Sequence, residues 1–218
     1  TGLTDCASCH DPHVQSKNMV GLLRMALHTP FARRQCKSCH GVDASRATTA
    51  QVPDLCYKCH EQSKEWFKKP VVHAAMTGKR ACLTCHAAHA GAERPALVAR
   101  EEKVCFACHD HKPFERKFVH EAMEDGCTAC HNPHSSDAAK LLTEDVAKLC
   151  QTCHSDMSKH VHKATSDKKD IRTGKPLTCT GCHMPHSADE KSLLSAEPTR
   201  ELCVKCHDPS MTPPLREH

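Results

Sequence analysis

The stretch HEAMEDGCTACHNPHSSDAAKLLTEDVAKLCQTCH, residues 120–154, contains the spacing Cys-x-x-Cys-His twice. The same spacing occurs nine times in the 218 residues and uses all 18 cysteines. The paired cysteines are Cys6 and Cys9, Cys36 and Cys39, Cys56 and Cys59, Cys82 and Cys85, Cys105 and Cys108, Cys127 and Cys130, Cys150 and Cys153, Cys179 and Cys182, and Cys203 and Cys206. The histidines directly after them are His10, His40, His60, His86, His109, His131, His154, His183 and His207. Because no cysteine is left over, one kind of chemistry accounts for all of them.

The histidine after each pair decides between the roles that paired cysteines can play. Disulfide frameworks, zinc sites and redox-active dithiols do not require a histidine at that position. Zinc sites built from two motifs each would also need an even number of motifs. Cys-x-x-Cys-His is the attachment sequence of c-type haem, in which two thiols form thioethers to one porphyrin and the histidine binds its iron. The sequence therefore predicts nine haem c groups, anchored by these cysteines and ligated on one side by these proximal histidines.

The composition leaves the interior short of apolar side chains. Hydrophobic residues reach 39% only because cysteine is counted among them, and aromatic residues make up 3%. Porphyrins at about one per 24 residues would fill the interior instead. The net charge of +4 is too small for a nucleic-acid-binding surface, and the longest apolar run, 19–27, is broken by Arg24. We therefore expect neither a nucleic-acid partner nor a transmembrane segment.

Eleven further histidines are available as distal ligands on the other side of the irons. Four of them follow a proximal histidine by three residues: His13, His89, His134 and His186. Three residues cannot carry the chain around a porphyrin, so each of these is expected to bind a neighbouring haem. Three more stand seven to nine residues before a motif and are also predicted as distal ligands: His28, His73 and His120. His162 is preferred over His160 for an eighth iron, and the ninth ligand is expected to be His111, His160 or His218.

The motifs are organised in repeats of two haems within a single domain, 1–218. In the clearest copy an upstream histidine precedes a motif with a second histidine three residues on, then Leu141-Leu142, then a second motif. The predicted units are 1–27 with one haem, and 28–72, 73–119, 120–159 and 160–218 with two each. Short helices are expected before the second motifs: Thr143 would cap 144–150, and Pro198 would lie in the first turn of 197–203. Sustained apolar alternation is absent, so little or no β-sheet is expected.

The unit His, Cys-x-x-Cys-His-x-Pro-His, Leu-Leu, Leu-Cys-x-x-Cys-His resembles the doubled-CXXCH family of multihaem c-type cytochromes over nearly the whole chain. The resemblance implies a fold of coil and short α-helices wrapped around closely packed haems. It also implies mostly bis-histidine haems that pass electrons in series outside the cytoplasm. Attachment of c-type haem takes place there as well, so we expect an exported protein of the periplasm or the cell exterior, with no signal peptide in this sequence.

Closely spaced haems favour an electron carrier over an enzyme, because electron tunnelling falls off exponentially with distance. The hypothesis is a conduit for respiratory or extracellular electron transport, with other redox proteins or extracellular acceptors as partners. Two assemblies are open: a periplasmic shuttle or conduit subunit, and a head-to-tail homopolymer that forms an extracellular filament. The alternative is a multihaem reductase of the nitrite, hydroxylamine or sulfite type, which needs an open iron position. No catalytic residue is predicted.

Overall fold

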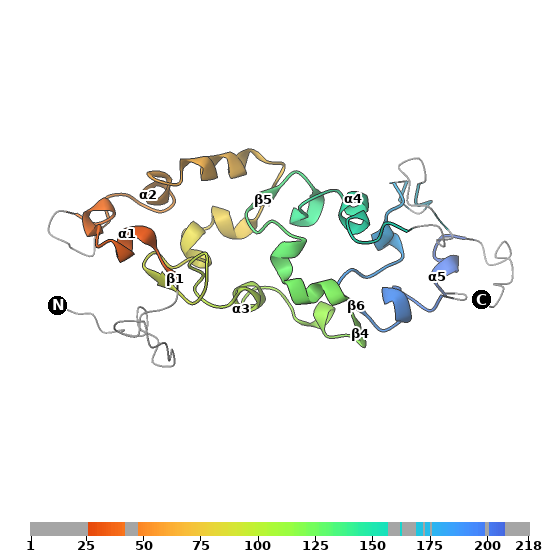
Figure 1. Cartoon of the computed structure of the whole chain (residues 1–218). Coiled ribbons are helices and arrows are strands. Elements are labelled where there is room, and N and C mark those ends of the chain that lie inside the picture. The colour runs from red at the N-terminus through yellow and green to blue at the C-terminus, as the bar shows by residue number, and fades with distance from the viewer. Residues whose placement is uncertain are drawn as a thin grey trace. The chain divides into compact units, whose positions relative to one another are not determined.

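The computed structural model describes residues 26–41, 48–156, 162, 169–171, 173–174, 176–198 and 201–207. In these residues short helices alternate with coil (Figure 1). The α-helices are α1 (Thr29–Ala32), α2 (Asp54–Tyr57), α3 (Glu101–Phe106), α4 (Val146–Gln151) and α5 (Glu201–Val204). The 3-10 helices are Cys36–Ser38, Glu61–Lys68, Ala74–Thr77, Ala81–Thr84, Lys112–Phe114, Glu121–Asp125, Cys127–Ala129, Ala139–Leu141, Cys179–Gly181 and Lys191–Leu193. The predicted fold class, mostly coil with short α-helices and little β-sheet, is confirmed.

Three antiparallel ladders of two-residue strands connect segments that are far apart in the sequence. They join β1 (Ala26–Leu27) to β3 (Ala90–Gly91), β2 (Val71–Val72) to β5 (Ser135–Ser136), and β4 (Phe118–Val119) to β6 (Ser187–Ala188). The first strand of each ladder runs directly into an upstream histidine, and the second directly follows a histidine at the plus-three position. Each ladder therefore fastens the start of one repeat to the next repeat along the chain.

The helices before the second motifs begin with acidic residues, which favour the positive end of the helix dipole. Asp54, Glu101 and Glu201 lie in the first turns of α2, α3 and α5. The prediction that Thr143 caps the helix of the 120–159 repeat is wrong. The cap is Asp145, whose side chain accepts a hydrogen bond from the Ala147 backbone N–H at 3.0 Å. An ionised carboxylate is acceptor-only and carries the favourable charge, which a threonine hydroxyl does not.

The buried positions among the described residues are occupied by small side chains. The buried hydrophobic residues are Ala26, Ala81, Ala90 and Ala188, and the largest fully buried side chains are Ser135 and Ser187. Since hydrophobic stabilisation scales with the apolar area removed from water, these residues contribute little to it. The polypeptide thus supplies little core of its own, as the composition indicates.

The chain divides into two compact units. The first consists of Thr1–His109 with Pro133–Ser136, and the second of Asp110–Asn132 with Asp137–His218. All ladders, ring pairs and hydrogen bonds discussed below lie within one unit or the other. No helix in the described part of the chain is long and apolar enough to cross a membrane.

Candidate haem attachment and ligation sites

Each described Cys-x-x-Cys-His motif forms one helical turn. The histidine backbone N–H donates to the carbonyl oxygen of the first cysteine, four residues earlier, with N···O distances of 2.9 to 3.0 Å. Residues at positions i, i+3 and i+4 of such a turn share one face. Both thiols and the proximal imidazole therefore start from the same side of the turn, as attachment to one porphyrin requires.

Successive attachment turns adjoin one another in chain order within each unit. The Cys56 thiol is hydrogen-bonded to Cys82 of the following motif, and Cys150 is hydrogen-bonded to Cys179 in the same way. Burial, and then the neighbouring thiol, raises the pKa of both Cys56 and Cys150 to about 11. Reactive dithiols need a lowered thiol pKa, so these shifts oppose a redox role for the cysteines themselves.

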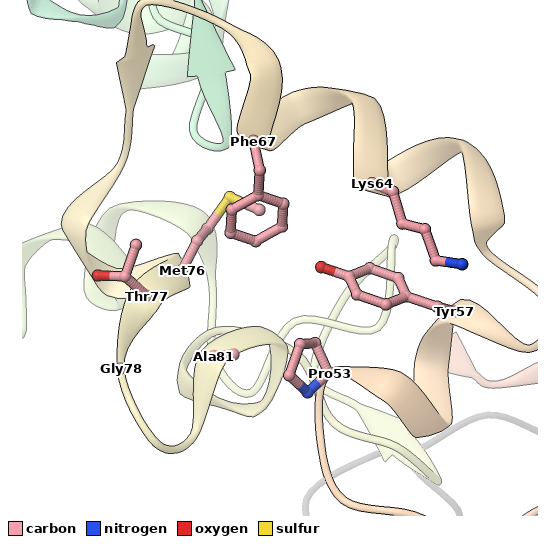
Figure 2. Close-up of a pocket in the computed structure, with 8 residues that line it drawn as sticks. All are labelled: Pro53, Tyr57, Lys64, Phe67, Met76, Thr77, Gly78 and Ala81. Atoms are coloured by element: carbon pink, nitrogen blue, oxygen red, sulfur yellow. The ribbon is translucent and has the colours of Figure 1, made fainter.

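An apolar cavity of about 480 Å³ lies beside two attachment turns of the first unit. Figure 2 shows the side chains of Tyr57, Phe67 and Met76 pointing into it. Tyr57 lies within one attachment motif, and Ala81, also in the lining, directly precedes the next motif. The Tyr57 and Phe67 rings meet edge to face at 6.4 Å. The cavity is therefore part of the attachment region of these two motifs.

The described histidines form pairs whose rings face each other at a constant separation. The ring centroids are 5.7 to 6.2 Å apart in His28–His60, His40–His89, His73–His109, His86–His134, His120–His154, His131–His186 and His162–His207. One member of every pair is a proximal histidine and the other is a predicted distal ligand. Two metal–nitrogen bonds of about 2 Å each, with half of each imidazole, account for about 6 Å. The pairs thus fit an iron between them.

The order of the pairs follows two rules. The upstream histidine of a repeat faces the second motif of the same repeat, as His73 faces His109 at 6.2 Å. The plus-three histidine faces the first motif of the preceding repeat, as His134 faces His86 at 6.1 Å. The sequence predicts that plus-three histidines reach neighbouring haems, and the structure brings them opposite neighbouring proximal histidines. Binding of the neighbouring haems by these histidines stays a prediction.

Burial acts on the plus-three histidines in the direction that metal binding requires. It lowers the pKa of His89, His134 and His186, and in each case the facing proximal histidine and the adjacent upstream histidine lower it further. A lowered pKa favours the neutral imidazole, which is the form that binds a metal.

Backbone carbonyls orient the proximal histidines of three first motifs. The Nδ1 atoms of His86, His131 and His183 donate to the carbonyl oxygens of Pro95, Lys140 and Ser192 at 3.0, 2.9 and 2.8 Å. A carbonyl only accepts, so Nδ1 carries the proton and Nε2 is left as the metal-binding atom. Two of the residues that carry these carbonyls, Lys140 and Ser192, have positive φ. So do the residues that follow the three carbonyls, Ala96, Leu141 and Leu193. Sequence reasoning missed these groups because a main-chain carbonyl has no residue type to recognise.

Several predicted residues stand apart from these pairs. His111 lies 3.7 Å from the Glu115 carboxylate, measured from Nδ1 to Oε1. Cys6, Cys9, His10, His13, His160 and His218 lie outside the described residues, as do residues 1–25 of the one-haem unit 1–27. In the part of the chain that is described, no cluster of three or more His, Cys, Asp or Glu side chains could hold a metal ion by itself.

The doubled CXXCH motif pattern matches residues 28–65, 73–114, 120–159 and 169–212. The chain belongs to the doubled-CXXCH family. It is also 27% identical over 243 aligned residues to the multiheme cytochrome MtrA of Shewanella baltica (strain OS185). That alignment covers 100% of this chain and 56% of the relative, so the chain spans about half of the length of the curated relative. This doubled-CXXCH protein is thus a multihaem c-type cytochrome that binds haem c.

Proposed function

We propose that this doubled-CXXCH protein is an electron conduit with nine haem c groups, all of them bis-histidine ligated. The observation that carries the proposal is the set of facing imidazole pairs at 5.7 to 6.2 Å, on attachment turns that adjoin in chain order. When bound, each haem iron takes up or gives up one electron.

The cysteines and histidines divide the work of holding the haems. The cysteine pairs of each helical turn would bind one porphyrin covalently, and the proximal and distal imidazoles would hold its iron. In the seven facing pairs the proposed distal ligands are His28, His73, His89, His120, His134, His162 and His186. His13 is the eighth proposed distal ligand, and the ninth comes from His111, His160 or His218. Irons closed on both sides carry electrons without binding a substrate.

The proposed location is the periplasm or the cell exterior, where c-type haem is attached. The partners are other redox proteins or extracellular electron acceptors. Two assemblies fit this role: a periplasmic shuttle or conduit subunit, and a head-to-tail homopolymer that forms an extracellular filament. Negative-stain electron microscopy distinguishes them, because the homopolymer is expected to form long regular filaments and the subunit discrete particles.

The proposal is tested on the chain produced with its haems attached. Intact-mass spectrometry is expected to give the polypeptide mass plus nine haem masses, since all nine motifs share the same Cys-x-x-Cys-His spacing. Electron paramagnetic resonance of the oxidised protein is expected to show low-spin signals alone. A high-spin signal equal to one haem would contradict the carrier role and favour the reductase, and a smaller mass would contradict nine haems.

A further inference from the structure

Each described plus-three histidine has an aromatic ring close to its imidazole. The ring centroids are 5.0 Å apart for Phe31 and His89, 4.1 Å for Trp66 and His134, and 4.5 Å for Phe114 and His186. Phe31, Trp66 and Phe114 are three of the few aromatic residues in a chain with 1 Trp, 1 Tyr and 5 Phe. Trp66 and Phe114 precede the strand that pairs beside their histidine and Phe31 follows it, yet all three reach a plus-three histidine, which indicates a shared role.

The contact of Trp66 differs in geometry from the other two. The Trp66 and His134 rings are inclined by only 10°, whereas Phe31 and Phe114 are tilted by 41° and 33° against their histidines. A parallel contact at 4.1 Å covers the imidazole face with the whole indole system. The facing pair His86–His134 is also nearly parallel, at 19°, whereas His131–His186 is inclined by 39°. The pair His40–His89, beside the more distant and more tilted Phe31, is inclined by 25°.

The two-residue ladders hold each aromatic residue beside its histidine. Phe31 lies in α1, three residues after His28, whose backbone N–H donates to the His89 carbonyl at 2.8 Å. Trp66 lies in the 3-10 helix Glu61–Lys68, shortly before β2, and β2 pairs with the strand that follows His134.

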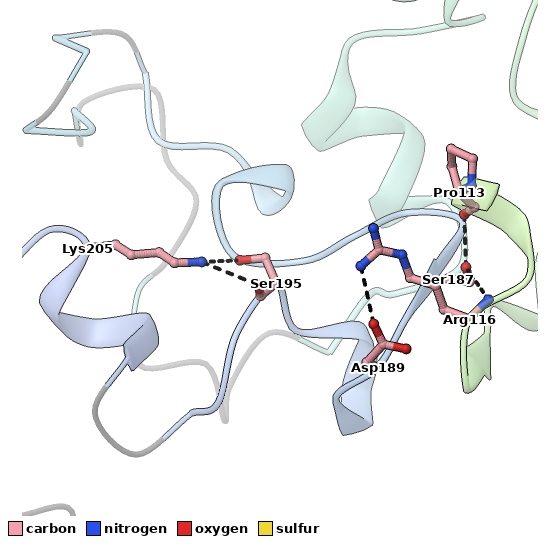
Figure 3. A network of polar contacts seen from close by, with 6 residues as sticks. All are labelled: Pro113, Arg116, Ser187, Asp189, Ser195 and Lys205. Carbon is pink, nitrogen blue, oxygen red and sulfur yellow. Dashed lines mark hydrogen bonds and ion pairs between the residues drawn. The ribbon is translucent and has the colours of Figure 1, made fainter. Parts of the chain in front are cut away.

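Phe114 is held by a buried serine in the strand that follows His186. The Ser187 hydroxyl donates to the Pro113 carbonyl at 2.8 Å and accepts from the Arg116 backbone N–H at 3.1 Å, as Figure 3 shows. Arg116 also reaches the Asp189 carboxylate at 3.5 Å. The segment that carries Phe114 is therefore fixed on both sides of the ring.

We propose that Phe31, Trp66 and Phe114 are positioning residues that set the rotation of the distal imidazoles His89, His134 and His186 about their iron–nitrogen bonds, Trp66 most strongly. The inference rests on the proposed function, because it concerns histidines that ligate haem iron. An imidazole bound through one nitrogen can turn about that bond, and an aromatic ring stacked on its face resists the turn. The same ring keeps water from the ligand.

The test replaces Trp66 in the haem-loaded protein. Trp66→Leu keeps an apolar side chain but removes the stacking face, and Trp66→Phe restores an aromatic ring. Phe118→Leu is the matched control, because the Phe118 ring lies 5.2 Å from Lys117 Nζ and forms no ring pair with a histidine among the described residues. Haem content is measured first for each variant.

Two measurements report the orientation of the His134 imidazole and how firmly it stays bound to the iron. In Trp66→Leu, one haem equivalent of the low-spin resonance is expected to move or broaden. Binding of carbon monoxide to the reduced protein at one haem is expected to tighten about 2- to 10-fold, as the loss of an aromatic pair worth about 0.5–1.4 kcal/mol implies. Trp66→Phe is expected to return both readouts most of the way to wild type, and Phe118→Leu to leave them unchanged.

The results distinguish failure of the positioning role from failure of the proposed function. A Trp66→Leu protein with all its haems and the wild-type resonance and carbon monoxide affinity would overturn the positioning role. If Trp66→Leu loses haem, Phe114→Leu provides the same test at His186, with a smaller expected change because its contact is tilted. Wild-type protein without low-spin bis-imidazole signals would instead contradict the proposed function.

Discussion

The repeats at 28–65 and 120–159 carry the same two attachment motifs but hold the first proximal histidine differently. In the later repeat His131 donates from Nδ1 to the Lys140 carbonyl and forms a β-bridge with Leu142. In the earlier repeat His40 forms its bridge with Thr48, and its buried Nδ1 meets no hydrogen-bond acceptor within the described residues. An identical motif therefore does not ensure an identical ligand environment.

The length of the connection between the two motifs accompanies this difference. Cys127 and Cys150 are 23 positions apart, whereas Cys36 and Cys56 are 20 apart. In the longer connection Lys140 and Leu141 take positive φ values of 59° and 60°, and the turn presents the Lys140 carbonyl to His131. The comparison teaches that the connection, rather than the motif, orients the proximal imidazole.

The largest effect is expected when the histidine that one repeat extends toward the preceding repeat is removed. His186 belongs to the 169–212 repeat but faces His131 of the 120–159 repeat at 6.1 Å. His186→Ala is expected to turn one low-spin haem high-spin, because the iron of the earlier repeat loses its distal ligand, and electron paramagnetic resonance measures the change. His186→Met is the control, expected to stay low-spin with a raised reduction potential. A fully low-spin His186→Ala protein would refute the crossed ligation.

A smaller effect is expected from one position at which the three ladders differ. Gly91, Ser136 and Ala188 occupy equivalent places in β3, β5 and β6, and only the first is a glycine. A Cβ on Gly91 would lie 2.4 Å from the Ala96 carbonyl carbon. Gly91→Ala is expected to lower the free energy of unfolding by about 1–3 kcal/mol, since the backbone must shift.

Guanidinium unfolding followed by circular dichroism measures this loss. Gly78→Ala is the matched control, because its added Cβ would find only the Ala75 carbonyl oxygen, 3.8 Å away. Equal unfolding midpoints for the two variants would show that the close approach at Gly91 carries no energetic cost.

The smallest expected effect concerns the left-handed turn itself. Lys140 is exposed at a φ of 59°, where a side chain costs energy that glycine avoids. Lys140→Gly is therefore expected to raise the free energy of unfolding by about 0.5–1 kcal/mol. Lys148→Gly, in the exposed face of α4, is expected to lower it by about 1 kcal/mol. A Lys140→Gly protein as destabilised as Lys148→Gly, measured in the same unfolding experiment, would exclude strain in the turn.

Residue types and spacing were sufficient to predict the class of protein and the fold class. The nine Cys-x-x-Cys-His motifs identify c-type haem attachment, and the family comparison confirms a doubled-CXXCH cytochrome. The helix cap was assigned wrongly, to Thr143 rather than Asp145, because both residue types cap helices and only the backbone conformation selects one. The distal ligands stay predictions, although the facing ring pairs support them.

The sequence by itself determined the chemistry of this protein, because covalent attachment needs two thiols and an imidazole at fixed positions in one turn. Only the tertiary structure decided which histidine faces which. The ladder that brings His134 opposite His86 joins segments far apart in the chain, and the Lys140 carbonyl that orients His131 is a main-chain group common to every residue. Long-range pairing and backbone direction depend on how the whole chain folds, which local spacing does not specify.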